Sequence, residues 1–216
     1  MTIEKFLHSC VRLTEEGGHR LLIDPGSFCF VEGRVKAGEL GPVEVILLTH
    51  EHADHFDPDA LRTIVAAGMP TILAHPPLAE KVRAAGLPCE DIAPGATRTI
   101  GAFTIEAMAT PHGALPFPVP PHCGYLINDQ LYHPGDSLVF PTGRAIDILA
   151  LPIAGPWCTV LAAVDAAKAL HPNHVIPIHD AIIQPFFLDR LQSIVAKALE
   201  GTGITFHPAT IGRVMG

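Results

Sequence analysis

The sequence predicts an α/β protein in which two β-sheets pack face to face and helices cover their outer faces. Short apolar runs typical of strands are followed by longer segments typical of helices, and this order occurs twice along the chain. Hydrophobic residues make up 48% of the 216 residues and charged residues only 17%, which suits well-buried strands. No linker, repeat or low-complexity segment divides the chain. We therefore expect a single domain over residues 1–216.

The first half of the chain is expected to open with strands and then to alternate strands with helices. Gly17-Gly18 indicates a hairpin turn between two of these strands. Asp57-Pro58 indicates the start of a helix that ends near Gly68. Residues 25–42 carry four Gly and two Pro, which predicts an irregular connection. The expected strands lie around residues 2–7, 10–15, 19–24, 43–48 and 71–74, and a second helix lies around residues 77–85.

The second half repeats this alternation. Strands are expected around residues 98–109, 123–128, 130–133, 146–151, 174–178 and 204–206. Helices are expected around residues 159–170 and 185–199. The polar residue types that carry chemistry fall at strand ends or in loops, which is where a scaffold presents a functional site.

One segment, His50-Glu51-His52-Ala53-Asp54-His55, places three imidazoles and the carboxylate of Asp54 in six positions directly after a buried strand, with Glu51 between the first two imidazoles. His50 and His52 lie two positions apart and can point the same way. Asp54 and His55 follow a bend and can face a second ion. Neutral imidazole and ionised carboxylate are ligands that suit zinc, iron and manganese. The alternative is a His-rich polar turn, but four ligand-type side chains at one strand end favour a dinuclear metal site.

This segment resembles the HxHxDH signature of the metallo-β-lactamase superfamily. Four further segments resemble the superfamily in the same order, so the resemblance runs over residues 21–179. They are residues 21–26, 110–113, 134–137 and 175–179. The resemblance implies an αββα sandwich of two mixed β-sheets with helices on the outer faces.

The resemblance also implies a ligand set for two divalent ions. The first ion would be held by His50, His52 and His112, the second by Asp54, His55 and His179, and Asp136 would bridge them. Two ions roughly 3.5–4 Å apart need bridging anions, and a bridging hydroxide is available because bound water has its pKa lowered to about 7. Zinc is the first choice, with iron and manganese as alternatives. Asp24 would accept a hydrogen bond from a ligand imidazole, or alternatively cap a turn.

The rim of the pocket is expected to come from residues 25–42, 113–122 and 153–158, with Phe117 and Trp157 among its aromatic side chains. Asp54 would orient the hydroxide as well as bind metal. His8, in a His-Ser-Cys opening that resembles one branch of the superfamily, and His122 either line the pocket and donate a proton to a leaving group or are structural. Surface or structural positions are expected for His19, His75, His133, His171, His174 and His207.

Composition excludes several classes of function. The formal net charge is −8 and no cluster of Lys or Arg occurs, so we expect no nucleic-acid partner. The N-terminal residues lack the pattern of a signal peptide, and no apolar run is long enough to span a bilayer. Five scattered Cys without a Cys-x-x-Cys pair are typical of a reduced, cytoplasmic protein. Secreted zinc β-lactamases carry an export signal and lack the bridging Asp, so antibiotic hydrolysis is not expected.

Residues 151–155, 165–167 and 175–179 are similar to the branch that contains L-ascorbate-6-phosphate lactonase and related metal-dependent hydrolases. The first of these segments usually has Pro-Ile-Gly-Gly, whereas Ala154 stands here in place of the first Gly. The leading hypothesis is hydrolysis of a small-molecule ester, lactone or phosphodiester. The alternatives are an iron-dependent oxidoreductase on the same fold and a non-catalytic metal-binding module. The sequence does not indicate an oligomeric state.

Overall fold

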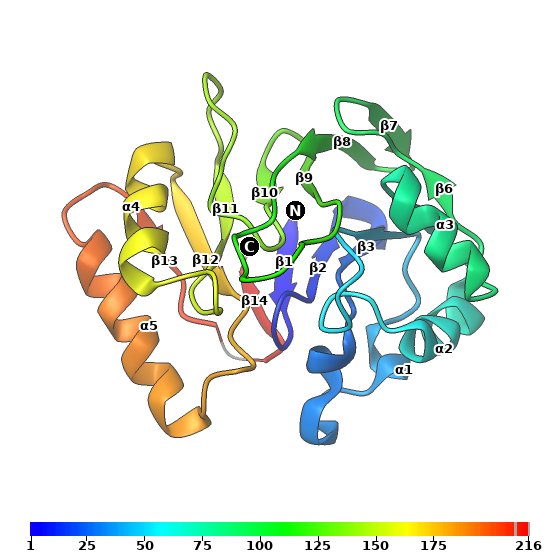
Figure 1. Cartoon of the computed structure of the whole chain (residues 1–216), viewed down its shortest axis with the longest axis horizontal. Coiled ribbons are helices and arrows are strands. Elements are labelled where there is room, and N and C mark those ends of the chain that lie inside the picture. Colours follow the sequence, from blue (N-terminus) through cyan, green and yellow to red (C-terminus); the bar gives the residue numbers. More distant parts are fainter. Residues whose placement is uncertain (210, 216) are drawn as a thin grey trace.

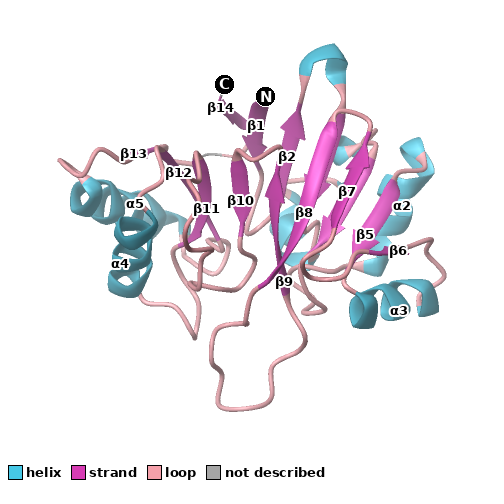
Figure 2. Cartoon of the chain, turned by 90° about the horizontal axis from the view of Figure 1, so that it is seen from above, coloured by secondary structure: helices cyan, strands magenta, loops and turns pink. Residues whose placement is uncertain are grey.

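The computed structural model describes residues 1–209 and 211–215. It consists of two β-sheets packed face to face, with helices on the outer faces (Figures 1 and 2), which confirms the predicted fold class. Each sheet has seven strands and combines parallel with antiparallel neighbours. Side chains such as Leu13, Leu47 and Tyr125 fill the apolar layer between the sheets, which is the central core.

The first sheet contains the N-terminal strands together with the last strand of the chain, in the order β14-β1-β2-β3-β4-β5-β6. The strands from β14 to β3 pair antiparallel, and those from β3 to β6 pair parallel. Their bounds are β1 Thr2–Lys5, β2 Val11–Thr14, β3 Arg20–Ile23, β4 Val45–Leu48, β5 Thr71–Ala74, β6 Glu90–Asp91 and β14 Arg213–Met215. Because β3 and β4 are parallel, their carboxyl ends meet at the same edge of the sheet.

The second sheet has the order β13-β12-β11-β10-β9-β8-β7. Its strands from β7 to β10 pair antiparallel, and those from β10 to β13 pair parallel. Their bounds are β7 Thr97–Ile100, β8 Phe103–Ala109, β9 Cys123–Ile127, β10 Leu131–His133, β11 Ile148–Pro152, β12 His174–Ile178 and β13 Thr205–Phe206.

Each sheet is covered by the helices that its own half of the chain contributes (Figure 1). Over the first sheet, Leu61 and Leu78 belong to the same apolar cluster as Ile46. Over the second, Val164 and Val195 belong to the apolar layer outside the sheet. The helices are α1 Ala37–Leu40, α2 Pro58–Gly68, α3 Pro76–Ala84, α4 Val160–Leu170 and α5 Pro185–Leu199, and the 3-10 helices are η1 Glu16–Gly18 and η2 Ser27–Gly33.

Most expected elements are confirmed, with four corrections. The connection over residues 25–42 contains η2 and α1. The single strand expected over residues 98–109 is a hairpin, because Gly101 adopts φ +54° and turns the chain between β7 and β8. The strands β6 and β14 were not predicted, since two or three residues are too few to show an apolar alternation.

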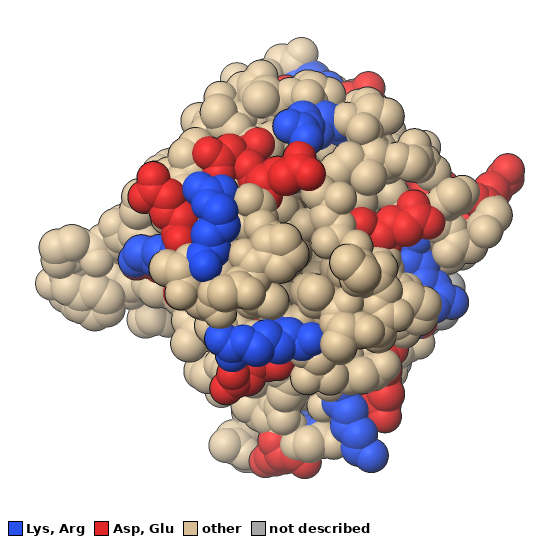
Figure 3. All heavy atoms as spheres, turned by 90° about the vertical axis from the view of Figure 1, so that its right-hand side faces the viewer, with Lys and Arg blue, Asp and Glu red and all other residues tan. Residues whose placement is uncertain are grey.

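The face beside α2 and α3 shows basic and acidic side chains next to one another (Figure 3). Arg83 pairs with Asp91 at 2.8 Å, and similar pairs join Arg62 to Asp59, Lys81 to Glu51 and Arg98 to Glu90. The cations on this face are therefore neutralised locally. Within the described residues, no helix combines the length and apolar character that crossing a bilayer requires.

Candidate metal centre

The centre begins where β4, a fully buried strand, ends at Leu48. The chain then turns tightly, and the backbone N–H groups of His55 and Phe56 both donate to the carbonyl of His52. The loop after β3 presses against this turn at Gly26, where a Cβ atom would lie 2.1 Å from the carbonyl carbon and oxygen of Asp54. Only glycine permits this approach, so the local sequence places the loop after β3 and the loop after β4 in direct contact.

The first group of ligand-type side chains comprises His50, His52, His112 and Asp136. Nδ1 of His52 lies 3.0 Å from Nε2 of His50 and 3.2 Å from Nε2 of His112. Oδ2 of Asp136 lies 3.7 Å and 3.4 Å from the same two Nε2 atoms. His112 follows β8 and Asp136 follows β10, so the second sheet completes a group that begins on the first.

The second group comprises His8, Asp54, His55 and His179. Oδ2 of Asp54 lies 3.0 Å from Nε2 of His8, 3.7 Å from Nε2 of His55 and 3.6 Å from Nε2 of His179. Asp136 reaches this group as well, with Oδ1 at 2.8 Å from His55 Nε2 and Oδ2 at 3.2 Å from His179 Nε2. The carboxylate of Asp136 therefore lies between the two groups, where the resemblance implied a bridging ligand.

The donor atoms fit metal ions by spacing and by burial. A tetrahedral ion with bonds of about 2.0–2.1 Å separates its ligand atoms by roughly 3.3 Å, and the distances above scatter around this value. Among the described residues, His55 Nε2, His179 Nε2 and Asp136 Oδ1 are buried and lack a hydrogen-bond partner. Burying such atoms unpaired is costly, whereas a metal ion would satisfy them.

Comparison with known proteins identifies the family to which this fold belongs. The model of the beta-lactamase superfamily domain matches residues 2–179. The chain belongs to the metallo-β-lactamase superfamily. It is similar to Protein Rv0786c of Mycobacterium tuberculosis, with 35% identity over 194 residues and 86% of each chain covered. It is also similar to a UPF0173 metal-dependent hydrolase of Rubrobacter xylanophilus, with 29% identity over 80% of this chain and 78% of the other.

A solved structure shows the same fold at lower identity. Igni18, a metallo hydrolase of Ignicoccus hospitalis, superimposes with a TM-score of 0.72 at 20% identity, covering 99% of this chain and 97% of the other. The family match ends at residue 179, so it covers every segment on which the resemblance was recognised.

Hydrogen bonds orient the imidazoles of this metallo-β-lactamase-fold centre. Nδ1 of His55 donates to Oδ2 of Asp24 at 2.7 Å, and Nδ1 of His112 donates to the carbonyl of Gly113 at 2.7 Å. Nδ1 of His50 lies 3.0 Å from Oγ1 of Thr49, whose hydroxyl donates to Asp24 at 2.7 Å. In each ring the hydrogen bond at Nδ1 turns Nε2 toward the other donor atoms.

The fully buried carboxylate of Asp24 therefore lies where the sequence placed it, beside a ligand imidazole. It accepts three hydrogen bonds, two from Thr49 and one from His55. Sequence reasoning missed Thr49, whose hydroxyl connects Asp24 to His50. Its position directly before the first ligand was the only available signal.

Of the two roles left open for His122, the structure favours the structural one over that of a proton donor. Its Nδ1 donates to the carbonyl of Thr110 at 2.9 Å, and its Nε2 accepts from the backbone N–H of Asp136 at 3.0 Å. Burial lowers the pKa of His122 to about 4, so the ring stays neutral and retains both bonds at neutral pH. His122 anchors the bridging segment instead. His133 is likewise structural, because its Nε2 donates to the carbonyl of Ser9.

Trp157 forms one wall of the centre. Its ring lies 6.0 Å from the ring of His112 and 5.4 Å from that of His179, measured between centroids, so it touches both groups. It packs so closely on Gly113 that a Cβ atom there would lie 2.4 Å from the indole. Phe117, by contrast, is 59% exposed at the surface of the loop before β9.

The electrostatics of the metal-free centre favour the forms that bind metal. Burial lowers the pKa of His50 well below its usual value. Burial raises the pKa of Asp136, but the neighbouring imidazoles, His55 foremost among them, together outweigh it and hold that pKa well below its usual range. Burial also raises the pKa of Asp54, but the hydrogen bond from His8 and the neighbouring charges lower it to about 2. His55 is the exception, because Asp136 and Asp24 overcome burial and raise its pKa well above the usual value.

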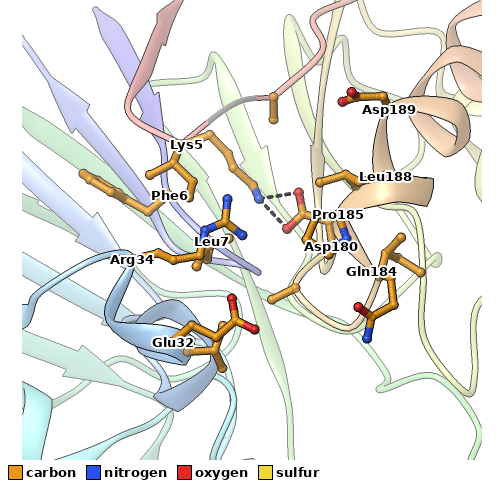
Figure 4. A pocket seen from close by; sticks show the side chains of 15 residues that line it. Lys5, Phe6, Leu7, Glu32, Arg34, Asp180, Gln184, Pro185, Leu188 and Asp189 are labelled. Carbon is orange, nitrogen blue, oxygen red and sulfur yellow. Dashed lines mark hydrogen bonds and ion pairs between the residues drawn. The ribbon is translucent and has the colours of Figure 1, made fainter.

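A separate pocket of about 510 Å³ lies behind the centre, between η2 and the start of α5 (Figure 4). Among the described residues that line it, none belongs to the seven ligands implied by the resemblance. Lys5 reaches across its inner wall to both carboxylate oxygens of Asp180 at 2.5 Å. Asp180 also accepts from the backbone N–H of His8 at 3.1 Å. Sequence reasoning missed this pair, which holds the backbone that carries His8.

Proposed function

We propose that this chain, as one domain over residues 1–216, is a dinuclear metal-dependent hydrolase of a small ester, lactone or phosphodiester. The observation that carries the proposal is the position of Asp136, whose two carboxylate oxygens contact donor atoms of both groups. The names of relatives such as the Rubrobacter xylanophilus hydrolase support the reaction class. Zinc is the proposed metal, because the imidazoles and carboxylates of the two groups match its preferred ligands.

The first ion would be held by His50, His52 and His112, and the second by Asp54, His55 and His179, with Asp136 shared. Divalent ions bound there would polarise the scissile oxygen and make a water molecule nucleophilic at neutral pH. His122 and Asp24 keep Asp136 and His55 in place. Asp54, which is ionised and partly exposed, accepts a hydrogen bond from the attacking water and so orients it.

Substrate reaches the centre on the side of His52 and Asp54, since these are the ligands that remain partly exposed while the others are buried. The indole of Trp157 lies against the rings of His112 and His179. We therefore propose that the reacting group meets the metals while an apolar part of a small molecule packs on the indole. Local pairing of surface cations supports the absence of a nucleic-acid partner, and we propose a cytoplasmic location.

The test is a screen of the zinc-loaded protein against an activated ester, a lactone and an activated phosphodiester, with the Asp136→Ala variant as the control. We expect saturable turnover of one class, abolished by chelation, restored by zinc and absent in the variant. Turnover no higher than that of Asp136→Ala for all three classes would reject the proposal. Iron retained in place of zinc, with activity that depends on its redox state, would favour the oxidoreductase alternative. Metal binding without any turnover would favour the non-catalytic module.

A further inference from the structure

The second group contains a side chain that the resemblance does not assign to metal. Nε2 of His8 lies 3.0 Å from Oδ2 of Asp54, and the two atoms belong to a set of four donor atoms that all lie within 4.8 Å of one another. The first group has the same arrangement, with four donor atoms within the same limit. His8 thus occupies in the second group a place equivalent to that of a ligand in the first.

The fold holds this ring rigidly. His8 adopts φ +58°, a left-handed backbone conformation that a residue with a side chain keeps only when its surroundings impose it. Its N–H donates to Asp180 at 3.1 Å, and its carbonyl accepts from the backbone N–H of His179 at 3.1 Å. Asp180 is itself fixed by Lys5 (Figure 4). The strained backbone of His8 is therefore tied to the strand end that carries His179.

The surroundings of the ring also point toward metal. The side chain is fully buried, and its ring centroid lies 4.0 Å from that of His179. Among the described residues, Nδ1 of His8 has no hydrogen-bond partner, and the hydrogen bond of the ring goes to Asp54, which is itself a candidate ligand. His133, which is just as buried, has both ring nitrogens bonded to backbone groups. His8 differs from this structural histidine because its bonded nitrogen, Nε2, faces a candidate ligand carboxylate and not the backbone.

We propose that His8 coordinates the second ion through Nε2, as a ligand additional to the seven that the resemblance implies. This inference rests on metal binding by the second group, which is part of the proposed function. With Asp54, His55, His179 and Asp136, the second ion would have five protein ligands, against four for the first. The first ion would then retain the more open coordination, which is the property of a catalytic zinc site.

Cadmium binds imidazole and carboxylate ligands and has a spin-half isotope, so NMR can test the proposal without any substrate. The full-length protein, with isotope-labelled histidine, is loaded with that isotope, and the one-bond couplings between cadmium and ring nitrogens are recorded. We expect coupling to the six histidines of the two groups, including Nε2 of His8, with the remaining proton of His8 on Nδ1. His133 serves as an internal control and should show no coupling.

The alternative role, in which His8 only donates a hydrogen bond to Asp54, predicts a proton on Nε2, no coupling at His8, and five coupled histidines. That result would overturn the inference. The His8→Gln variant identifies the signal of His8. Residues outside the coordination sphere already change metal affinity by about 10–100-fold, so loss of a direct ligand should weaken binding of the second cadmium ion by more than about 100-fold. A weakening below about tenfold would also count against coordination.

The same spectra separate this inference from the dinuclear proposal. Coupling at His8, His55 and His179 alone would retain His8 as a ligand and remove the two-ion site. Coupling at His50, His52 and His112 alone would remove both. Absence of hydrolysis with all six couplings present would leave the coordination of His8 intact and reject only the proposed activity.

Discussion

Replacing Asp24 by Asn changes one oxygen to an amide nitrogen in a fully buried position that accepts three hydrogen bonds. The amide has one acceptor oxygen, and its best orientation turns that oxygen toward Thr49 Oγ1 and His55 Nδ1. The amide NH2 then faces the backbone N–H of Thr49, a contact between two donors. Loss of a hydrogen bond to a charged acceptor costs roughly 1.5–3 kcal/mol, and burial leaves no water to offset it.

We therefore expect Asp24→Asn to lower the free energy of unfolding of the metal-free protein by roughly 1.5–3 kcal/mol. Zinc affinity should fall by about 10–100-fold, because His55 loses the charged partner that orients it. Urea denaturation measures the first quantity, and competition with a chromophoric chelator measures the second. Asp165→Asn, at an exposed position on α4, is the control and should change neither. If zinc affinity in Asp24→Asn stayed within about twofold of wild type, the supporting role of Asp24 would be refuted.

Three further predictions follow from the same geometry. Asp136→Ala should lose bound metal and activity much more than His133→Ala, because His133 bonds only backbone groups; equal metal content in the two variants would contradict the bridging role. Gly113→Ala should displace Trp157, because the added methyl group overlaps the indole. The fluorescence of this sole tryptophan should then shift and KM should rise while two ions stay bound. An unchanged spectrum and KM would argue against Trp157 as a wall of the substrate site. Burial lowers the pKa of His55, but Asp136 and Asp24 raise it well above its usual value. His55 is therefore protonated at neutral pH without metal, and zinc must displace that proton. Affinity should rise between about pH 6 and pH 8 with proton release in calorimetry, and constant affinity would disprove this charge state.

The candidate ligands named from the sequence come together in the structure, and several of them follow elements that the sequence marks clearly. His50 follows a continuous apolar run, and His179 follows another. Both runs became parallel strands, whose ends meet at one edge of their sheets. Local pattern located the strand ends, and the resemblance to the family selected which of their polar side chains are candidate ligands.

The residues that support those ligands were harder to predict, because their partners are distant in sequence. Lys5 meets Asp180 only after the first sheet has packed against the second. A signal did exist, since Lys5 falls in phase with the buried Ile3 on an alternating strand. His122 looked like a pocket residue because its neighbours are proline-rich, yet its ring is bonded to the backbones of Thr110 and Asp136.

The central claim is that two ions share Asp136. The most direct measurement is elemental analysis of protein purified without chelator and saturated with zinc, set against protein concentration. The account predicts two ions per chain for the wild type, with markedly weaker binding in Asp136→Ala. One ion per chain at saturation would contradict it.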